Sequence, residues 1–239
     1  MPMNVLIVHA HPEPKSFCSA MAAAAAEELM RQGHQIQLSD LYAMEFNPVA
    51  SAADFGARVD SDYCVYALEQ RNALRTNTLA PDIRLELDKL LHCDLLILNF
   101  PIFWFSTPAL LKGWIDRVLV SGVVYGGKRF YDRGGLSGKR ALVNVTLGGQ
   151  EHMFHDDGVH GPLAHMLRHL LQGTLAYIGM EVLPLHVGWH VPYVSDAQRR
   201  QLMESWRTRL QTLSEATPLC FPRLDDFDES LRPKVFTSA

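Results

Sequence analysis

The chain has 239 residues, of which 48% are hydrophobic and 20% charged, and this balance excludes a protein that is disordered throughout. Its 22 Lys and Arg residues against 26 Asp and Glu residues give a net charge of −4. Such a chain lacks the broad positive field that binding to nucleic acid or to an anionic membrane surface requires, so we expect neither partner.

The first residues form a strand-like apolar run at positions 3–8, with no cationic leader before it and no cleavage site after it. No segment approaches the roughly 20 uninterrupted apolar residues of a membrane span, so we expect no membrane insertion. The four cysteines lie far apart, at Cys18, Cys64, Cys93 and Cys220, and suit a reducing compartment better than a disulfide framework. We therefore expect a cytoplasmic protein.

Short strand-like runs, of which the one at residues 35–41 is more polar than the others, alternate with helical stretches along the chain. The pattern predicts strands at residues 5–9, 35–41, 94–100, 140–146 and 181–186. It predicts helices at residues 17–33, 108–120, 161–179 and 197–213, the first closed by Gly33 and the second begun by Pro108. Such alternation predicts an α/β fold built on a parallel sheet.

Two stretches depart from this alternation. Residues 42–80 have weak periodicity and are interpreted as an inserted excursion of loop and helix. Residues 217–239 contain three prolines and an acidic run at 225–229, which indicates an irregular tail with a solvated surface. We expect a single domain over residues 1–216 with an insertion at about 42–80, followed by the tail 217–239.

The loop after the first strand, residues 10–18, leads directly into a helix. A helix N-terminus offers free backbone N–H groups and a positive dipole end, which suit a phosphate group, and His11, Lys15 and Ser16 could add donors. The glycine patterns of nicotinamide-binding Rossmann domains and of nucleotide-hydrolysing loops are both absent. An ordinary capped helix explains the loop equally well.

Two further loops follow strands of the same sheet. Three aromatic residues, Phe103, Trp104 and Phe105, follow the third strand and form either a platform for a flat ring or a hydrophobic loop packed under a neighbour. Gly148 and Gly149 follow the fourth strand, where bare backbone N–H groups can approach a ligand closely. Because ligands bind at the carboxyl ends of parallel strands, the three loops together predict a flavin nucleotide site.

At these residues the sequence resembles the NAD(P)H:quinone oxidoreductases of the flavodoxin-like superfamily, the DT-diaphorase type. The resemblance runs from residue 4 to about residue 220, and it is carried by VHAHPEPKSF, SDLYAMEFNP, LAPDI, DLLILNFPIFWFSTPALLKGWIDRV and the TLGG–GVHG segment. It implies a flavodoxin-like, doubly wound five-stranded parallel sheet of order 2-1-3-4-5 and a homodimer with flavin at the subunit interface. It also implies a two-step hydride transfer from NAD(P)H through the flavin to a quinone.

The resemblance also implies which residues bind the cofactor. Those residues are His11, Lys15, Phe17 and Cys18 in the phosphate loop, Pro101, Ile102, Phe103, Trp104 and Phe105 beside the flavin ring, Thr146, Leu147, Gly148 and Gly149 at its polar edge, and Asp116 and Arg199 near an adenine half. Asp116 and Arg199, with the insertion, favour FAD over FMN. Lys15 and Cys18 depart from the mammalian pattern, which has threonine and asparagine there.

The proton donor implied by the resemblance is His160, while the tyrosine that accompanies it in mammalian relatives is replaced by Phe154. A hydrogen-bonded histidine at a helix start is the structural alternative for His160. The substrate slot would be lined by Trp104, Phe105 and Phe154, and closed by Tyr125 and Tyr177 of a partner subunit.

Other functions stay open at this point. The protein could be an ancillary regulatory flavoprotein of a potassium efflux antiporter, since these also have Phe at position 154, an FMN-dependent reductase of azo or nitro compounds, or a one-electron carrier. The spacings His152–His155 and His165–His169 are compatible with metal ligands. No third ligand with suitable reach is evident, so we expect no metal site.

Overall fold

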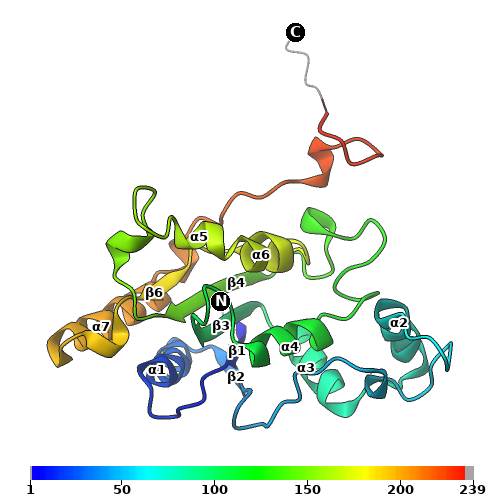
Figure 1. Cartoon of the computed structure of the whole chain (residues 1–239), viewed down its shortest axis with the longest axis horizontal. Coiled ribbons are helices and arrows are strands. Elements are labelled where there is room, and N and C mark those ends of the chain that lie inside the picture. The colour runs from blue at the N-terminus through cyan, green and yellow to red at the C-terminus, as the bar shows by residue number, and fades with distance from the viewer. Residues whose placement is uncertain (1, 235–239) are drawn as a thin grey trace.

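A parallel sheet forms the centre of the computed structural model, which describes residues 2–234 (Figure 1). Its first four positions are occupied by β2 (Gln35–Asp40), β1 (Asn4–His9), β3 (Leu95–Pro101) and β4 (Arg140–Thr146). The fifth position is shared by β5 (Glu181–Val182) and β6 (His186–Gly188), both of which pair with β4 in parallel. The predicted flavodoxin-like sheet of order 2-1-3-4-5 is confirmed.

The fifth strand is not the single run predicted at residues 181–186. Pro184 separates β5 from β6, and proline has no N–H group to contribute to a strand ladder. The chain therefore leaves β4 after Val182 and returns to it at His186, so that β4 is paired at both of its ends.

Helices cover both faces of the sheet (Figure 1). On one face, α1 (Phe17–Arg31) and α7 (Asp196–Gln211) pack against alternate strand residues such as Ile7 and Ile97. On the other face, α3 (Pro81–His92), α4 (Ala109–Val118) and the segment 163–178 pack against the intervening residues such as Leu96. This arrangement follows from the period of two along a strand, which turns neighbouring side chains to opposite faces.

The predicted helix at residues 161–179 is wrong as a continuous element. It is divided into α5 (Leu163–Met166), α6 (Arg168–Leu170) and the π-helical segment η4 (Leu171–Ala176). The Thr174 hydroxyl donates to the carbonyl of His169 at 3.0 Å, and the Tyr177 N–H donates to the Gln172 carbonyl with a π-helical spacing. A side-chain hydrogen bond of this kind competes with the backbone ladder, and Gly173 adds little helical preference.

The helix α3 was not among the predicted elements. Its signals are nevertheless present in the sequence: Pro81 begins the helix, and Ile83, Leu87 and Leu90 have a helical spacing and are buried. The preceding excursion, residues 42–80, contains the short turn η1 (Ala52–Asp54) and the helix α2 (Tyr66–Thr76).

The remaining short helical turns are η2 (Tyr131–Arg133), η3 (Glu151–Phe154), η5 (Val191–Tyr193), η6 (Leu213–Glu215) and η7 (Leu224–Asp226). Within residues 2–234, every helix is too short or too polar to cross a membrane.

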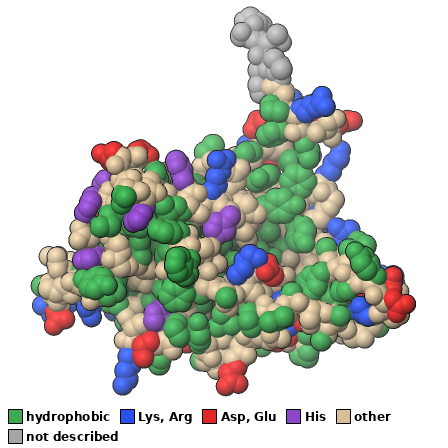
Figure 2. Space-filling view, in the orientation of Figure 1, with side chains coloured by type: hydrophobic (Ala, Val, Ile, Leu, Met, Phe, Trp, Pro, Cys, Tyr) green, Lys and Arg blue, Asp and Glu red, His purple; other side chains and the backbone are tan. Residues whose placement is uncertain are grey.

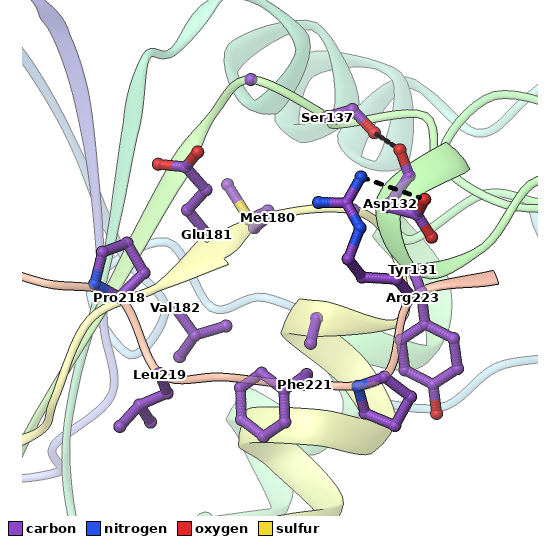
Figure 3. A pocket seen from close by; sticks show the side chains of 14 residues that line it. Tyr131, Asp132, Ser137, Met180, Glu181, Val182, Pro218, Leu219, Phe221 and Arg223 are labelled. Atoms are coloured by element: carbon purple, nitrogen blue, oxygen red, sulfur yellow. Dashed lines mark hydrogen bonds and ion pairs between the residues drawn. The ribbon is translucent and has the colours of Figure 1, made fainter. Parts of the chain in front are cut away.

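The tail after Ala216 runs along the body and then extends away from it (Figure 1). The Leu219 N–H donates to the Val182 carbonyl at 2.8 Å, and the Leu224 N–H donates to the Asp132 carboxylate at 2.7 Å. Figure 3 shows Arg223 of the tail directed at Asp132. Both residues line a hollow of about 280 Å³. The last five residues of the predicted tail, 235–239, lie outside the described residues.

Candidate functional site

A cavity of about 290 Å³ opens at the carboxyl end of the sheet, between the loops that follow β1, β3 and β4. The predicted site residues that line it are His11, Phe17, Cys18, Pro101, Ile102, Phe103, Thr146, Leu147 and Gly148. Ser16, Val191 and Pro192 complete the lining. The last two were not predicted, because they come from the turn after β6 and no local motif marks them.

One end of the cavity is formed by the start of α1. Ser16 caps the helix by accepting the N–H of Ser19 at 3.0 Å. Within residues 2–234, the backbone N–H groups of Phe17 and Cys18 have no hydrogen-bond acceptor. Free amides at the positive end of a 15-residue helix provide a site for an anionic group such as phosphate.

Three predicted side chains, those of His11, Lys15 and Cys18, lie in or next to the loop that precedes α1. Burial lowers the pKa of His11, whose Nδ1 lies 3.0 Å from the Glu13 N–H and 3.1 Å from the Glu13 carbonyl. Burial raises the pKa of the Cys18 thiol to about 12, so this residue is not a nucleophile. Lys15 is exposed on the loop and does not line the cavity.

The aromatic wall is built from a tight turn with unusual backbone geometry. Phe103 and Ser106 exchange two backbone hydrogen bonds at 3.1 and 3.0 Å, and the residues between them, Trp104 and Phe105, have φ angles of +50° and +58°. Two successive positive φ angles define a type I′ turn, which normally contains Asn or Gly. Aromatic residues in this conformation cost on the order of 1 kcal/mol or more each, and such strain concentrates at functional sites.

The turn directs its aromatic rings away from the core. Trp104 is 96% exposed and Phe105 is 43% exposed in the single chain. An indole this exposed is unusual, because burial of its ring stabilises a protein by several kcal/mol on the scale of about 25 cal/mol per Å². These rings are therefore available to contact a ligand or another chain.

Gly148 lines another edge of the cavity, and Gly149 follows it along the loop after β4. Their carbonyl groups are held by His190, whose Nδ1 donates to the Gly148 carbonyl at 2.7 Å and whose N–H donates to the Gly149 carbonyl at 2.9 Å. The N–H groups of both glycines have no acceptor within the part of the chain that the structure describes. A Cβ atom on Gly149 would lie 2.6 Å from the Phe154 ring, so a larger residue there would require that ring to shift.

His160 lies beside this edge within a group of aromatic rings. Its ring centroid is 5.0 Å from that of Phe154 and 5.1 Å from that of Phe105, and Trp189 packs on Phe154 at 5.3 Å. Histidine side chains gather over this part of the surface (Figure 2). Trp189 was not predicted, since it belongs to the loop after β6.

The remaining predicted residues do not reach this cavity in the single chain. Asp116, Tyr125 and Tyr177 line a separate hollow of about 190 Å³, where Asp116 pairs with Lys112 at 2.6 Å. Arg199 lies near the start of α7, with its Nε atom buried and without an acceptor within residues 2–234. The structure thus places some of the predicted site residues at the cavity and others in the His160 group or in this second hollow, while Lys15, Trp104 and Arg199 belong to none of the three.

The sequence matches the family model described as a flavodoxin-like fold over residues 3–210. It is 41% identical to a ribosyldihydronicotinamide dehydrogenase [quinone] of Pongo abelii, over 90% of this chain and 94% of the relative. It is 40% identical to NAD(P)H dehydrogenase [quinone] 1 of Rattus norvegicus, over 94% of this chain and 82% of the relative. A crystal structure of a candidate quinone reductase from Klebsiella pneumoniae superposes with a TM-score of 0.91 and 35% identity, covering 97% of this chain and 94% of that one.

Proposed function

This chain belongs to the flavodoxin-like family, and we infer that it is an enzyme that reduces quinones with NAD(P)H. The observation that carries this conclusion is a single cavity lined by Phe17 and Cys18 at the start of α1, by Phe103 and by Gly148. The backbone N–H groups of Phe17, Cys18 and Gly148 have no acceptor within residues 2–234. This arrangement fits a long, flat ligand with a negative group at one end and a polar ring edge at the other.

We propose that the ligand is a flavin nucleotide. Its phosphate would be held by the amides of Phe17 and Cys18 and by the ring of His11, and Lys15, which is exposed on the same loop, would add a point charge. Its ring would lie against the turn 103–106, with its polar edge at Gly148 and Gly149. A bound flavin supplies the group that accepts hydride from NAD(P)H and passes two electrons to the quinone.

We propose FAD as the form bound. The buried Nε of Arg199 has no partner within residues 2–234, which supports a further polar ligand group at this end of α7. The exposed Asp116 would contribute from the second hollow. FMN would leave both residues without a role in binding.

The chain's own residues would hold the reactants and stabilise charge. Trp104, Phe105 and Phe154 would sandwich a flat substrate and exclude water from it. His160 is proposed to hold or donate a proton at the polar ring edge, because its imidazole lies on Phe105 and Phe154 beside Gly149. The amides of Gly148 and Gly149 would donate hydrogen bonds to charge that develops there.

We propose that the enzyme is a homodimer. Trp104 is almost fully exposed, and a second aromatic group, in which Phe130 stacks on Tyr177 at 5.5 Å and Tyr125 lies 6.0 Å from Tyr177, stands apart from it on the single chain. A partner that brings Tyr125 and Tyr177 over the cavity would bury both groups. Sedimentation at micromolar concentration should show a dimer, and a fully active monomer would contradict this proposal.

Cysteine usage supports a cytoplasmic location, which we also propose. All four cysteines are free, and Cys64 and Cys220 are exposed. Exposed thiols that stay unpaired suit a reducing compartment.

The function is tested by turnover and by cofactor analysis of the purified protein. We expect NAD(P)H-dependent reduction of menadione, a yellow protein, and an acid-released flavin that co-migrates with FAD. A protein that binds neither FAD nor FMN would overturn the flavin proposal, and a flavoprotein that is not reduced by NAD(P)H would overturn the enzymatic one.

A further inference from the structure

Three polar side chains cross the centre of the sheet in one row beneath the cavity. His9 of β1 is in register with Asn99 of β3, which is in register with Asn144 of β4. They are 3%, 1% and 0% exposed, on the face that α1 covers, where neighbouring strand residues are apolar. Polar groups in such a position are costly unless they are hydrogen-bonded, so their partners show what they stabilise.

The hydrogen bonds run in one direction along the row. The Asn144 amide donates to Asn99 Oδ1 at 2.5 Å, which turns the Asn99 amide N–H₂ toward His9 and α1. Asn99 Nδ2 then donates to His9 Nδ1 at 2.7 Å and to the Cys18 carbonyl at 3.0 Å. Because His9 Nδ1 accepts, Nε2 carries the proton, and it donates to Ser19 Oγ at 3.0 Å.

The row therefore ends on the first turn of α1. Ser19 Oγ, which accepts from His9, donates to the Glu13 carbonyl at 3.0 Å and lies 2.9 Å from Ser16 Oγ, the cap of the helix. Cys18 and Ser19 are thus tied through buried side chains to the ends of two central strands. Between Glu13 and Ser19 lie the free amides of Phe17 and Cys18.

We propose that His9, Asn99 and Asn144 are positioning residues that hold the start of α1 at the height and angle needed to bind the phosphate of a flavin nucleotide. This inference rests on the proposed function and adds residues that would not touch the cofactor. Burial lowers the pKa of His9, which keeps the ring neutral and its two nitrogens in the donor and acceptor roles that the row needs.

A role in packing alone does not explain the row. Apolar side chains of similar volume would fill the same space without the cost of burying amide and imidazole groups. The row instead fixes hydrogen-bond directions, which apolar packing does not. It fixes them on Cys18, which lines the cavity, and on Ser19, the next residue of α1. Disrupting the row should accordingly weaken binding of a flavin that carries a phosphate and leave binding of a flavin without one unchanged.

The test compares the affinities of apoprotein for FMN and for riboflavin, which lacks the phosphate, by fluorescence titration. His9→Leu and Ser19→Ala should each raise the Kd for FMN about 10-fold, which corresponds to about 1.4 kcal/mol. The double variant should bind FMN about as weakly as either single one, since both remove the same contact. Affinity for riboflavin should change less than about twofold in all three.

Ile7→Val provides the control, because Ile7 lies on the same strand and face, fully buried, two residues before His9. It should lower the Tm without weakening FMN binding. The inference is overturned if His9→Leu binds FMN as tightly as the parent, or if it loses FMN and riboflavin affinity equally. A parent that binds no flavin overturns the proposed function together with this inference.

Discussion

Replacing Arg117 by Met should lower the free energy of unfolding by about 3–5 kcal/mol, the range expected when one partner of a buried ion pair is removed. Arg117 on α4 is 2% exposed, and its guanidinium contacts Asp54 Oδ1 at 2.7 Å, Asp82 Oδ2 at 2.5 Å and the Asn47 carbonyl at 2.8 Å. It thereby joins α4 to α3 and to the 42–80 excursion.

The free energy of unfolding should fall because the substitution leaves the carboxylate of Asp54 buried without its positive partner. Asp54 is 2% exposed and also accepts the Tyr66 hydroxyl at 2.6 Å. Burial alone would raise the pKa of Asp54, but hydrogen bonds from Arg117, Tyr66 and Ser51 hold it below its usual value. Without Arg117, an uncompensated carboxylate is buried. Because the parent pKa is lowered, this stabilisation is present above the unfolded pKa of Asp54 and is lost as pH falls through the folded value.

Urea denaturation at neutral pH measures the effect. Arg84→Met is the matched control, because Arg84 of α3 pairs with Asp88 at 3.0 Å with both side chains largely exposed. An exposed i,i+4 pair contributes about 0.3–0.5 kcal/mol. Adding Asp54→Asn to Arg117→Met should restore part of the free energy of unfolding, since it removes the buried carboxylate that Arg117 no longer neutralises. If Arg117→Met and Arg84→Met lower the free energy of unfolding equally, the buried hydrogen bonds of Arg117 do not hold the excursion in place.

Replacing His160 by Gln should slow reduction of the bound flavin by NAD(P)H about 100-fold, the lower range for a group that handles a proton at the reacting centre. His160 is exposed, so its removal should leave the Tm and the flavin content unchanged. Its ring packs against both Phe105 and Phe154, and no other imidazole packs against these two rings within the described residues.

Stopped-flow bleaching of the flavin isolates this half-reaction from product release. His155→Gln is the control, since His155 is exposed on the same loop and contacts none of these rings in the described part of the chain. Its rate should stay within about twofold of the parent. If His160→Gln is reduced as fast as the parent from about pH 6 to about pH 8, His160 is structural and the amides of Gly148 and Gly149 stabilise the charge.

The sequence determined the architecture because its signals are local. Five strand-like runs, four of them apolar, separated by helical stretches are sufficient to predict a parallel sheet, and parallel strands place all their carboxyl ends at one edge. The loops containing Phe17, Phe103 and Gly148 could therefore be assigned to one site without coordinates, and they meet at one cavity. The helix signals of α3 were equally local and could have been used.

Only the tertiary structure decided which residues act together across strands and loops. The register that places His9 beside Asn99 and Asn144 depends on how three strands slide against one another, which no segment specifies alone. The positive φ angles of Trp104 and Phe105 contradict local preference and persist because the surrounding fold imposes them. The separation of Tyr125 and Tyr177 from the cavity likewise reflects long-range packing, because their positions along the chain do not fix the distance between them and the sheet edge.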